Sequence, residues 1–278
     1  MMGPLVSTAW LAGELGAPDL VVFDCTYYLP TEGKDAPALF RAARVPGARF
    51  FDIGVIADTE TALPHMVPTA GRFAAMMSAL GVSNGSRVVF YDQKGLQSAA
   101  RGWWMMGLFG HDSAAVLDGG LPKWVREGRP VVDGDVDRVE PGVFEPRLRA
   151  GRLRGLGDMM SADSERVVLD ARAAARFHGT APEPRAGLPS GHMPGSVNVP
   201  STSLLAADGT VLPPGELRAL FAAAGVDGTR PVVTSCGTGV TATILSLGLV
   251  LAGLPQGAVY DGSWTEWASR HDTIKETT

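Results

Sequence analysis

The chain has 278 residues, of which 45% are hydrophobic and 19% are charged, so it is long enough and apolar enough to build two domains with separate cores. Its net charge of −5 argues against a surface made mainly to attract nucleic acid or an anionic membrane. Only two cysteines occur, Cys25 and Cys236, which excludes a disulfide scaffold and a cysteine zinc site.

The sequence also bears on location. Residues 1–6 lack the basic patch and apolar run of a signal peptide. The longest apolar stretch, residues 244–254, is too short to span a bilayer and contains a glycine. We therefore expect a soluble, cytoplasmic protein that does not engage a membrane.

A long repeat organises the chain from its first predicted strand onward. A short apolar run ending in a carboxylate at Asp24 recurs at Asp170, and three further matches follow in the same order. The spacings of all four lie between 143 and 148 residues. The other matches are 44–48 with 192–196, 88–92 with 232–236, and 117–120 with 260–263. We infer a tandem duplication, whose internal interface makes a monomer sufficient.

Predicted strands and helices alternate within each half. Residues 73–80 form a helical pattern that stops at Gly81, and residues 216–224 form one that stops at Gly225. This alternation predicts an α/β fold in which each half is a mostly parallel sheet flanked by helices. We place the first domain at 1–135, a linker at 136–156 and the second domain at 157–278.

Cys236 lies where such sheets carry their chemistry, between a predicted strand at 231–235 and a predicted helix at 242–252. Gly237 and Gly239 allow the loop backbone to curl so that successive N–H groups, through those of Val240 and Thr241, point at one spot. Such donors favour a thiolate and would hold the charge of a persulfide. The hydroxyl groups of Thr238 and Thr241 add donors. The alternative, a merely buried thiol, suits Cys25 better because no glycine loop follows it.

Two arginines form a second candidate constellation. Arg176 and Arg185 lie on either side of a predicted loop in the same half as Cys236. Guanidinium groups bind carboxylates bidentately, so the pair suits an α-keto acid or a similar anion. The sequence leaves open the alternative that these arginines pair with Glu183 or Asp170. In the first half, His65 is a candidate for proton movement near neutral pH, although a single loop histidine is often structural.

The combined motifs resemble those of the tandem rhodanese family, and in particular its 3-mercaptopyruvate sulfurtransferases, over nearly the whole chain. The motifs that carry the resemblance are Phe-Phe-Asp-Ile at 50–53, Pro-His-Met at 64–66, Trp-Trp-Met at 103–105, Asp-Gly-Gly-Leu at 118–121, Glu-Pro-Arg at 183–185, Cys-Gly-Thr-Gly-Val-Thr-Ala at 236–242 and Tyr-Asp-Gly-Ser-Trp at 260–264.

The resemblance implies two rhodanese-like domains, of which only the second is active, and Asp92 stands where the repeat would place a first-domain cysteine. It implies sulfur transfer from a small anionic donor through a Cys236 persulfide to a thiol acceptor such as thioredoxin, or to cyanide. The neutral Gly237 and Thr238 match the mercaptopyruvate type, in which paired arginines, here Arg176 and Arg185, bind the substrate carboxylate.

Three positions depart from the family pattern. Thr238 replaces the usual serine and keeps its hydroxyl group. Gly54 replaces an acidic residue that would support the histidine matching His65, and Gln97 replaces an aromatic residue. The nucleophile and the arginine pair are unaffected by these changes.

Other functions remain as alternatives. A thiosulfate sulfurtransferase differs only in its donor. A cysteine phosphatase needs an arginine where this loop has Ala242. A non-catalytic rhodanese-like binding module would lack the nucleophile or its loop, and both are present. The proposed chemistry requires no metal and no organic cofactor.

Overall fold

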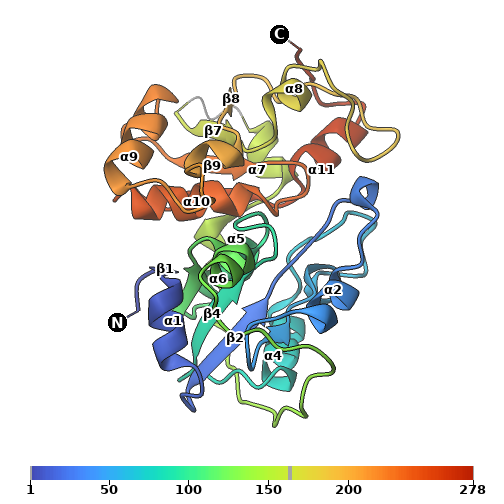
Figure 1. Ribbon diagram of the computed structural model, residues 1–278. Coiled ribbons are helices and arrows are strands. Elements are labelled where there is room, and N and C mark those ends of the chain that lie inside the picture. The colour runs from blue at the N-terminus through green and yellow to red at the C-terminus, as the bar shows by residue number, and fades with distance from the viewer. Residues whose placement is uncertain (1, 162–164, 278) are drawn as a thin grey trace. The chain divides into compact units, whose positions relative to one another are not determined.

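The computed structural model describes residues 2–161 and 165–277, which form two compact units (Figure 1). The first unit comprises Met1–Thr59, Val67–Arg149 and Ala207–Val211. The second comprises Glu60–Met66, Ala150–Ala206 and Leu212–Thr278. The short segments 60–66 and 207–211 therefore belong to the unit built mainly by the other half of the sequence.

The first unit contains a five-stranded parallel sheet with the strand order β1-β5-β4-β2-β3. Its strands are β1 (Leu5–Val6), β2 (Leu20–Asp24), β3 (Arg49–Phe50), β4 (Arg87–Tyr91) and β5 (Ala114–Leu117). Its helices are α1 (Thr8–Glu14), the 3-10 turn η1 (Pro30–Glu32), α2 (Ala36–Ala42), α3 (Ile53–Ile56), α4 (Ala70–Ala79), α5 (Ala99–Leu108) and α6 (Gly120–Arg126).

Helices cover both faces of this sheet, as expected for strands that are apolar along their whole length. Leu11 of α1, Phe40 of α2 and Trp124 of α6 share one core cluster with alternate residues of β2, β4 and β5. On the other face, α5 approaches Phe90 so closely that a Cβ atom at Gly102 would lie 2.3 Å from its ring. Glycine at position 102 thus permits the close packing of α5 on β4.

The second unit repeats this plan with the strand order β6-β10-β9-β7-β8, again all parallel. Its strands are β6 (Leu153–Arg154), β7 (Val167–Asp170), β8 (Val197–Asn198), β9 (Val232–Ser235) and β10 (Ala258–Tyr260). Its helices are the 3-10 turns η2 (Ala150–Arg152) and η3 (Ser201–Leu204) and the α-helices α7 (Leu156–Met160), α8 (Ala174–Phe177), α9 (Pro214–Ala223), α10 (Ala242–Leu251) and α11 (Ser263–Ser269). The predicted α/β fold with two parallel sheets is confirmed.

The segment after α6 crosses the surface of the first unit as an extended strap. Its backbone bonds to that unit at several points, for example Gly142 N–H to Ser78 O at 2.8 Å and Arg147 N–H to Phe109 O at 2.8 Å. The chain passes from the first unit to the second between Arg149 and Ala150, inside the predicted linker 136–156.

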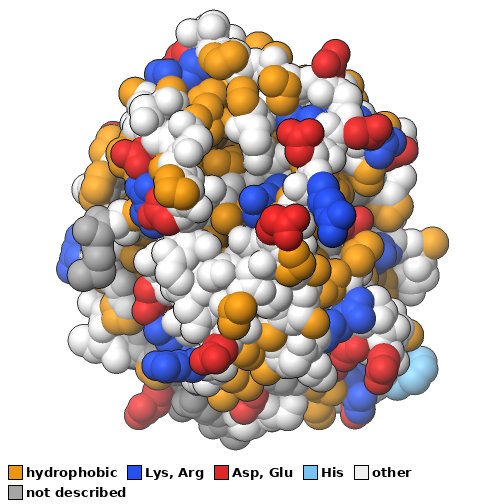
Figure 2. Space-filling model, turned by 90° about the horizontal axis from the view of Figure 1, so that it is seen from below, with side chains coloured by type: hydrophobic (Ala, Val, Ile, Leu, Met, Phe, Trp, Pro, Cys, Tyr) orange, Lys and Arg blue, Asp and Glu red, His pale blue; other side chains and the backbone are white. Residues whose placement is uncertain are grey.

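Membrane-spanning helices and clusters of like charge are two features that would point to a particular partner. No helix among the described residues is both long and apolar enough to cross a bilayer. On the face shown in Figure 2, acidic and basic side chains alternate instead of gathering into a field of one sign.

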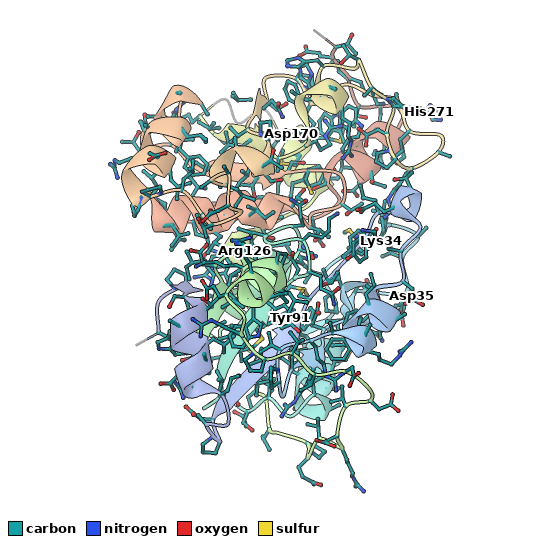
Figure 3. All side chains as sticks on the ribbon, in the orientation of Figure 1. Lys34, Asp35, Tyr91, Arg126, Asp170 and His271 are labelled. Carbon is teal, nitrogen blue, oxygen red and sulfur yellow. The ribbon has the colours of Figure 1, made fainter. Side chains whose placement is uncertain are left out.

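The matching ends of β2 and β7 differ in the partners that bond to a buried carboxylate. Asp170, labelled in Figure 3, ends β7 and pairs with the buried Arg172 at 2.7 Å. Asp24 ends β2, but Thr26 stands at the position of that arginine, and the Asp24 carboxylate accepts hydrogen bonds from Thr26 and Gln93 instead. Burial without a cation raises the pKa of Asp24 to about 6.

This difference predicts a pH-dependent stability. Folded Asp24 holds its proton up to about pH 6, whereas the ordinary pKa is 3.8, so its ionisation costs stability as the pH rises between these values. In urea unfolding, the free energy of unfolding of Asp24→Asn, relative to that of the wild type, should therefore rise by about 1–2 kcal/mol from pH 5 to pH 8. The matched variant Asp170→Asn should lose stability at pH 8, because it leaves Arg172 without its full partner. A wild-type-to-Asp24→Asn difference that does not change with pH would contradict this assignment.

Candidate active site around Cys236

Cys236 occupies the loop between the end of β9 and the start of α10, at the carboxyl edge of the second parallel sheet. Its side chain is only 2% exposed, while Gly237 and Thr238 beside it are half-buried. Gly239 has a φ of +75°, a conformation that glycine adopts without strain. The predicted strand, glycine loop and helix around the cysteine are all present.

The carbonyl groups at the start of this loop are held by the first turn of α11. Trp264 N–H donates to Cys236 O and Thr265 N–H donates to Gly237 O, both at 2.9 Å. The Thr265 hydroxyl also donates to Gly237 O at 2.7 Å. The loop is thus held in place through the carbonyl oxygens of Cys236 and Gly237, and not through the N–H groups of the residues that follow.

The donors of the loop are largely uncommitted. Within residues 2–161 and 165–277, the N–H groups of Gly237, Thr238, Val240 and Thr241 donate no hydrogen bond. These groups precede α10, whose dipole adds partial positive charge at its N-terminus. Successive backbone N–H groups before a helix N-terminus are the kind of donors that bind anions in proteins.

The first unit shows the same loop with an anion in place. Asp92 matches Cys236 in the repeat, and its carboxylate accepts four loop N–H bonds of 2.8–2.9 Å. The donors are Lys94, Gln97, Ser98 and Ala99. The spacing of the repeat relates the first three to Thr238, Thr241 and Ala242. The duplicated loop therefore binds a negative charge when one is supplied at this position.

Backbone strain is concentrated at this site. Among the described residues, only His65 (φ +62°) and Ser263 (φ +50°) have a positive φ without being glycine. The Ser263 hydroxyl accepts from Cys236 N–H at 3.2 Å and donates to Tyr260 O at 2.8 Å. In the first unit the matching residue is Gly120, where a Cβ atom would lie 2.5 Å from Asp92 O. Strain of this kind is retained where function requires it.

His65 is brought to the loop by the segment Glu60–Met66, which belongs to the second unit. Its Nδ1 atom lies 2.9 Å from the Thr238 hydroxyl oxygen, a hydrogen bond whose donor depends on the histidine tautomer. The side chain is 8% exposed. The threonine that departs from the family pattern thus still places its hydroxyl between the loop and a histidine.

Arg176 reaches the same loop from α8. Its Nη2 atom would lie 3.1 Å from a Cβ atom at Gly237, so the guanidinium group lies directly against the residue after the nucleophile. The sequence left open that this arginine pairs with Glu183, and Arg176 does so at 2.5 Å. Glu183 in turn pairs with Arg172 at 2.8 Å and therefore holds Arg176 in place.

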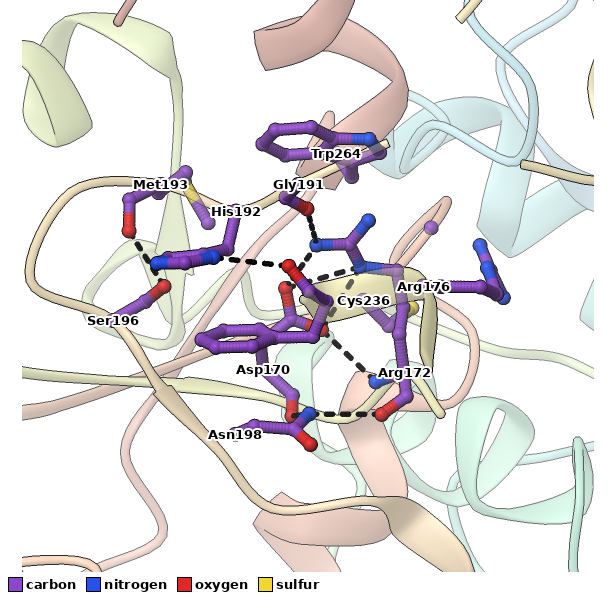
Figure 4. Close-up of polar contacts among 12 residues, drawn as sticks. Asp170, Arg172, Arg176, Gly191, His192, Met193, Ser196, Asn198, Cys236 and Trp264 are labelled. Atoms are coloured by element: carbon purple, nitrogen blue, oxygen red, sulfur yellow. Dashed lines mark hydrogen bonds and ion pairs between the residues drawn. The ribbon is translucent and has the colours of Figure 1, made fainter. Parts of the chain in front are cut away.

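Arg172 is the buried centre of this network, which Figure 4 shows beside Cys236 and Arg176. Its guanidinium group bonds Asp170 and the carbonyl oxygen of Gly191, and lies 4.4 Å from the ring centroid of Trp264. Trp264 is also the residue whose N–H group holds Cys236 O. Trp264 therefore contacts both the arginine network and the loop that carries Cys236.

Several of these residues escaped the sequence analysis. Arg185 lies half-buried two residues after Glu183, and its role in carboxylate binding stays a prediction from the resemblance. Glu183 was named only as a possible partner of the two arginines, Arg172 was given no role, and Ser263 was part of a repeat motif only. The sequence did offer a signal for Ser263, because the repeat places a glycine, Gly120, at the matching position of the first half. Among the described residues, no group of three or more His, Cys, Asp and Glu side chains could hold a metal ion.

The fold and the site together define a class: a tandem α/β protein whose second unit carries a buried cysteine in a glycine loop between a strand and a helix. The family model for the rhodanese-like domain matches residues 7–127 and 155–270. The chain belongs to the rhodanese family.

Individual relatives are similar over nearly the whole chain. The human 3-mercaptopyruvate sulfurtransferase is 42% identical over 98% of this chain and 95% of its own. The mitochondrial thiosulfate/3-mercaptopyruvate sulfurtransferase 1 of Arabidopsis thaliana is 41% identical, covering 97% and 77%. The crystal structure of the 3-mercaptopyruvate sulfotransferase SseA from Escherichia coli is 33% identical, with a TM-score of 0.85 over 95% of this chain and 99% of its own.

The occupied loop of the first unit predicts a specific stability loss. Replacing Asp92 with asparagine removes the charge and turns an amide N–H₂ towards backbone donors, so Asp92→Asn should lower the free energy of unfolding by about 2–3 kcal/mol. Urea unfolding measures this loss. Asp112→Asn, which breaks an exposed pair with Arg149, should cost below about 1 kcal/mol. Equal losses in the two variants would show that the loop does not bind the Asp92 charge specifically.

Proposed function

We propose that this protein is a sulfurtransferase that moves sulfur from 3-mercaptopyruvate through a persulfide on Cys236 to a thiol or to cyanide, releasing pyruvate. One observation carries the proposal: the loop of Cys236 is held by its carbonyl groups and leaves four N–H donors in the residues after the cysteine, with Arg176 against Gly237. Such a loop favours a thiolate and then accommodates the negative charge of a persulfide.

The first step is attack of the Cys236 thiolate on the sulfur atom of 3-mercaptopyruvate. The new S–S bond forms as the donor's C–S bond breaks, and the electron pair of that bond leaves as the pyruvate enolate. Arg176, oriented by Glu183, binds the donor carboxylate together with Arg185, which places the donor sulfur over the thiolate. The loop N–H groups and the Thr238 hydroxyl stabilise the charge on the departing enolate.

Protonation of the enolate carbon completes pyruvate. Thr238 and His65 form a hydrogen-bonded pair at 2.9 Å, so a proton taken up by His65 can reach the site through the threonine hydroxyl. In the second half of the cycle, an acceptor thiolate attacks the outer sulfur of the persulfide. The S–S bond then breaks and returns the Cys236 thiolate.

The loop composition favours mercaptopyruvate as the donor. Gly237 and Thr238 carry no charge, whereas a dianion such as thiosulfate is better matched by basic side chains next to the cysteine. Thiosulfate remains the second candidate, because the relatives include one named for both donors. A protein thiol such as that of thioredoxin is the acceptor that we propose, with the enzyme acting as a monomer in the cytoplasm.

Donor preference is tested by steady-state turnover with 3-mercaptopyruvate and with thiosulfate, using cyanide as the acceptor. We expect at least tenfold higher kcat/KM for mercaptopyruvate, and loss of turnover on both donors in Cys236→Ser, because a serine hydroxyl cannot form a persulfide. The control is Cys25→Ser, which alters a thiol whose pKa is raised by burial and which should keep its turnover. Higher kcat/KM for thiosulfate would overturn the donor assignment.

The carboxylate assignment has its own test. Arg176→Ala and Arg185→Ala should each raise the KM for 3-mercaptopyruvate by about 10- to 100-fold, because each removes a charge-assisted contact to the carboxylate. Arg230→Ala, which alters an exposed arginine bonded to Gly225 O at 2.8 Å, serves as the control. An unchanged KM in Arg185→Ala would remove Arg185 from the site.

A further inference from the structure

The loop 178–192, which carries Glu183 and Arg185, is held at its neck by the C-terminal tail, residues 273–277. The two ends of the loop meet near Arg176. At the start of the loop, the N–H groups of Thr180 and Ala181 donate to Ala175 O, and at its end Gly191 N–H donates to Arg176 O at 3.1 Å. The tail pairs with the loop at His192, with His192 N–H to Glu276 O at 2.8 Å and Glu276 N–H to His192 O at 3.0 Å.

Two glycines make room for the tail at the two ends of this loop. A Cβ atom at Gly191 would lie 2.4 Å from Glu276 O, and one at Gly179 would lie 2.7 Å from Thr277 Cγ2. Both glycines have a positive φ. The His192 ring also stacks on Phe177 of α8, with centroids 4.0 Å apart, next to Arg176 in the chain. The tail thus lies across the neck of the loop and not along its exposed tip.

The tail is attached in turn to α11. The Trp267 indole N–H donates to Ile274 O at 2.8 Å, and the buried Thr273 hydroxyl donates to Trp267 O at 2.5 Å. The first turn of the same helix holds the carbonyl oxygens of Cys236 and Gly237. A single element, α11 with its tail, therefore fixes the nucleophile loop at one end and the neck of the arginine loop at the other.

We propose that the tail residues Glu276 and Thr277 are positioning residues that set the distance between the carboxylate-binding arginines and Cys236. They do not touch the substrate and act through Gly191, whose N–H group holds Arg176 and whose carbonyl group holds Arg172. The inference rests on the proposed function, because it assumes that Arg176 and Arg185 bind the donor carboxylate. Loosening the tail should therefore weaken substrate binding and leave the nucleophile intact.

Two pairs of variants test this role in the full chain. Gly191→Ala places a methyl group against Glu276 O, whereas Gly187→Ala changes another positive-φ glycine of the same loop whose Cβ atom would meet nothing within 4 Å. Glu276→Pro removes the N–H group that bonds to His192, whereas Glu276→Ala keeps it. Within each pair, only the first variant disturbs the backbone contact between tail and loop. Glu276→Ala removes only the half-exposed carboxylate that lies 3.8 Å from His192 Nε2.

Three readouts separate positioning from general damage: KM for 3-mercaptopyruvate, kcat, and the rate at which iodoacetamide alkylates Cys236. Gly191→Ala and Glu276→Pro should raise KM about tenfold, with kcat and alkylation within about twofold of the wild type. The two controls should leave all three quantities within about twofold. The proposal would be overturned if both test variants left KM unchanged, whether or not they also lowered kcat and the rate of alkylation.

The arginine variants distinguish this failure from failure of the proposed function. If Arg176→Ala and Arg185→Ala raise KM but the tail variants do not, only the positioning role of the tail is wrong. If the arginine variants leave KM unchanged, the carboxylate assignment fails and the tail proposal fails with it. Should Gly191→Ala not fold, Glu276→Pro against Glu276→Ala decides alone.

Discussion

The hydrogen bonds from the first turn of α11 to the loop around Cys236 are the interaction on which the site depends. Trp264 and Thr265 take up the carbonyl oxygens of Cys236 and Gly237, and Ser263 takes up the N–H group of the cysteine. With these groups bonded, the N–H groups of Gly237, Thr238, Val240 and Thr241 have no acceptor among the described residues. The loop thus places a buried thiol beside backbone donors that precede the N-terminus of α10.

The duplication provides two versions of one fold with different chemistry. In the first unit, the Asp92 carboxylate occupies the loop donors, and Gly120 brings α6 against the loop backbone. In the second unit, a thiol replaces the carboxylate and Ser263 replaces the glycine. Asp24 and Asp170 differ in the same way, since only the second has a buried arginine as partner. The two units thus keep the same loop and differ at a few fixed repeat positions.

The sequence predicted the fold well because strand ends, glycine stops and the repeat are local signals. It located Cys236 between β9 and α10 and identified Arg176 and His65 as candidates. It did not predict that Glu183 bridges Arg172 and Arg176, because several pairings of these charges are compatible with the sequence. The exchange of segments 60–66 and 207–211 between the units, and the pairing of the tail with His192, are tertiary contacts without any local signal.

The most direct test of the central claim is the fate of the donor sulfur in a reaction without an acceptor. The protein is mixed with 3-mercaptopyruvate, and its intact mass, its peptides and the released pyruvate are then measured. The account predicts a mass gain of one sulfur atom that maps to Cys236, one pyruvate per added sulfur, and removal of that sulfur by cyanide. Pyruvate release without sulfur on Cys236, or sulfur that maps to another residue, would contradict it.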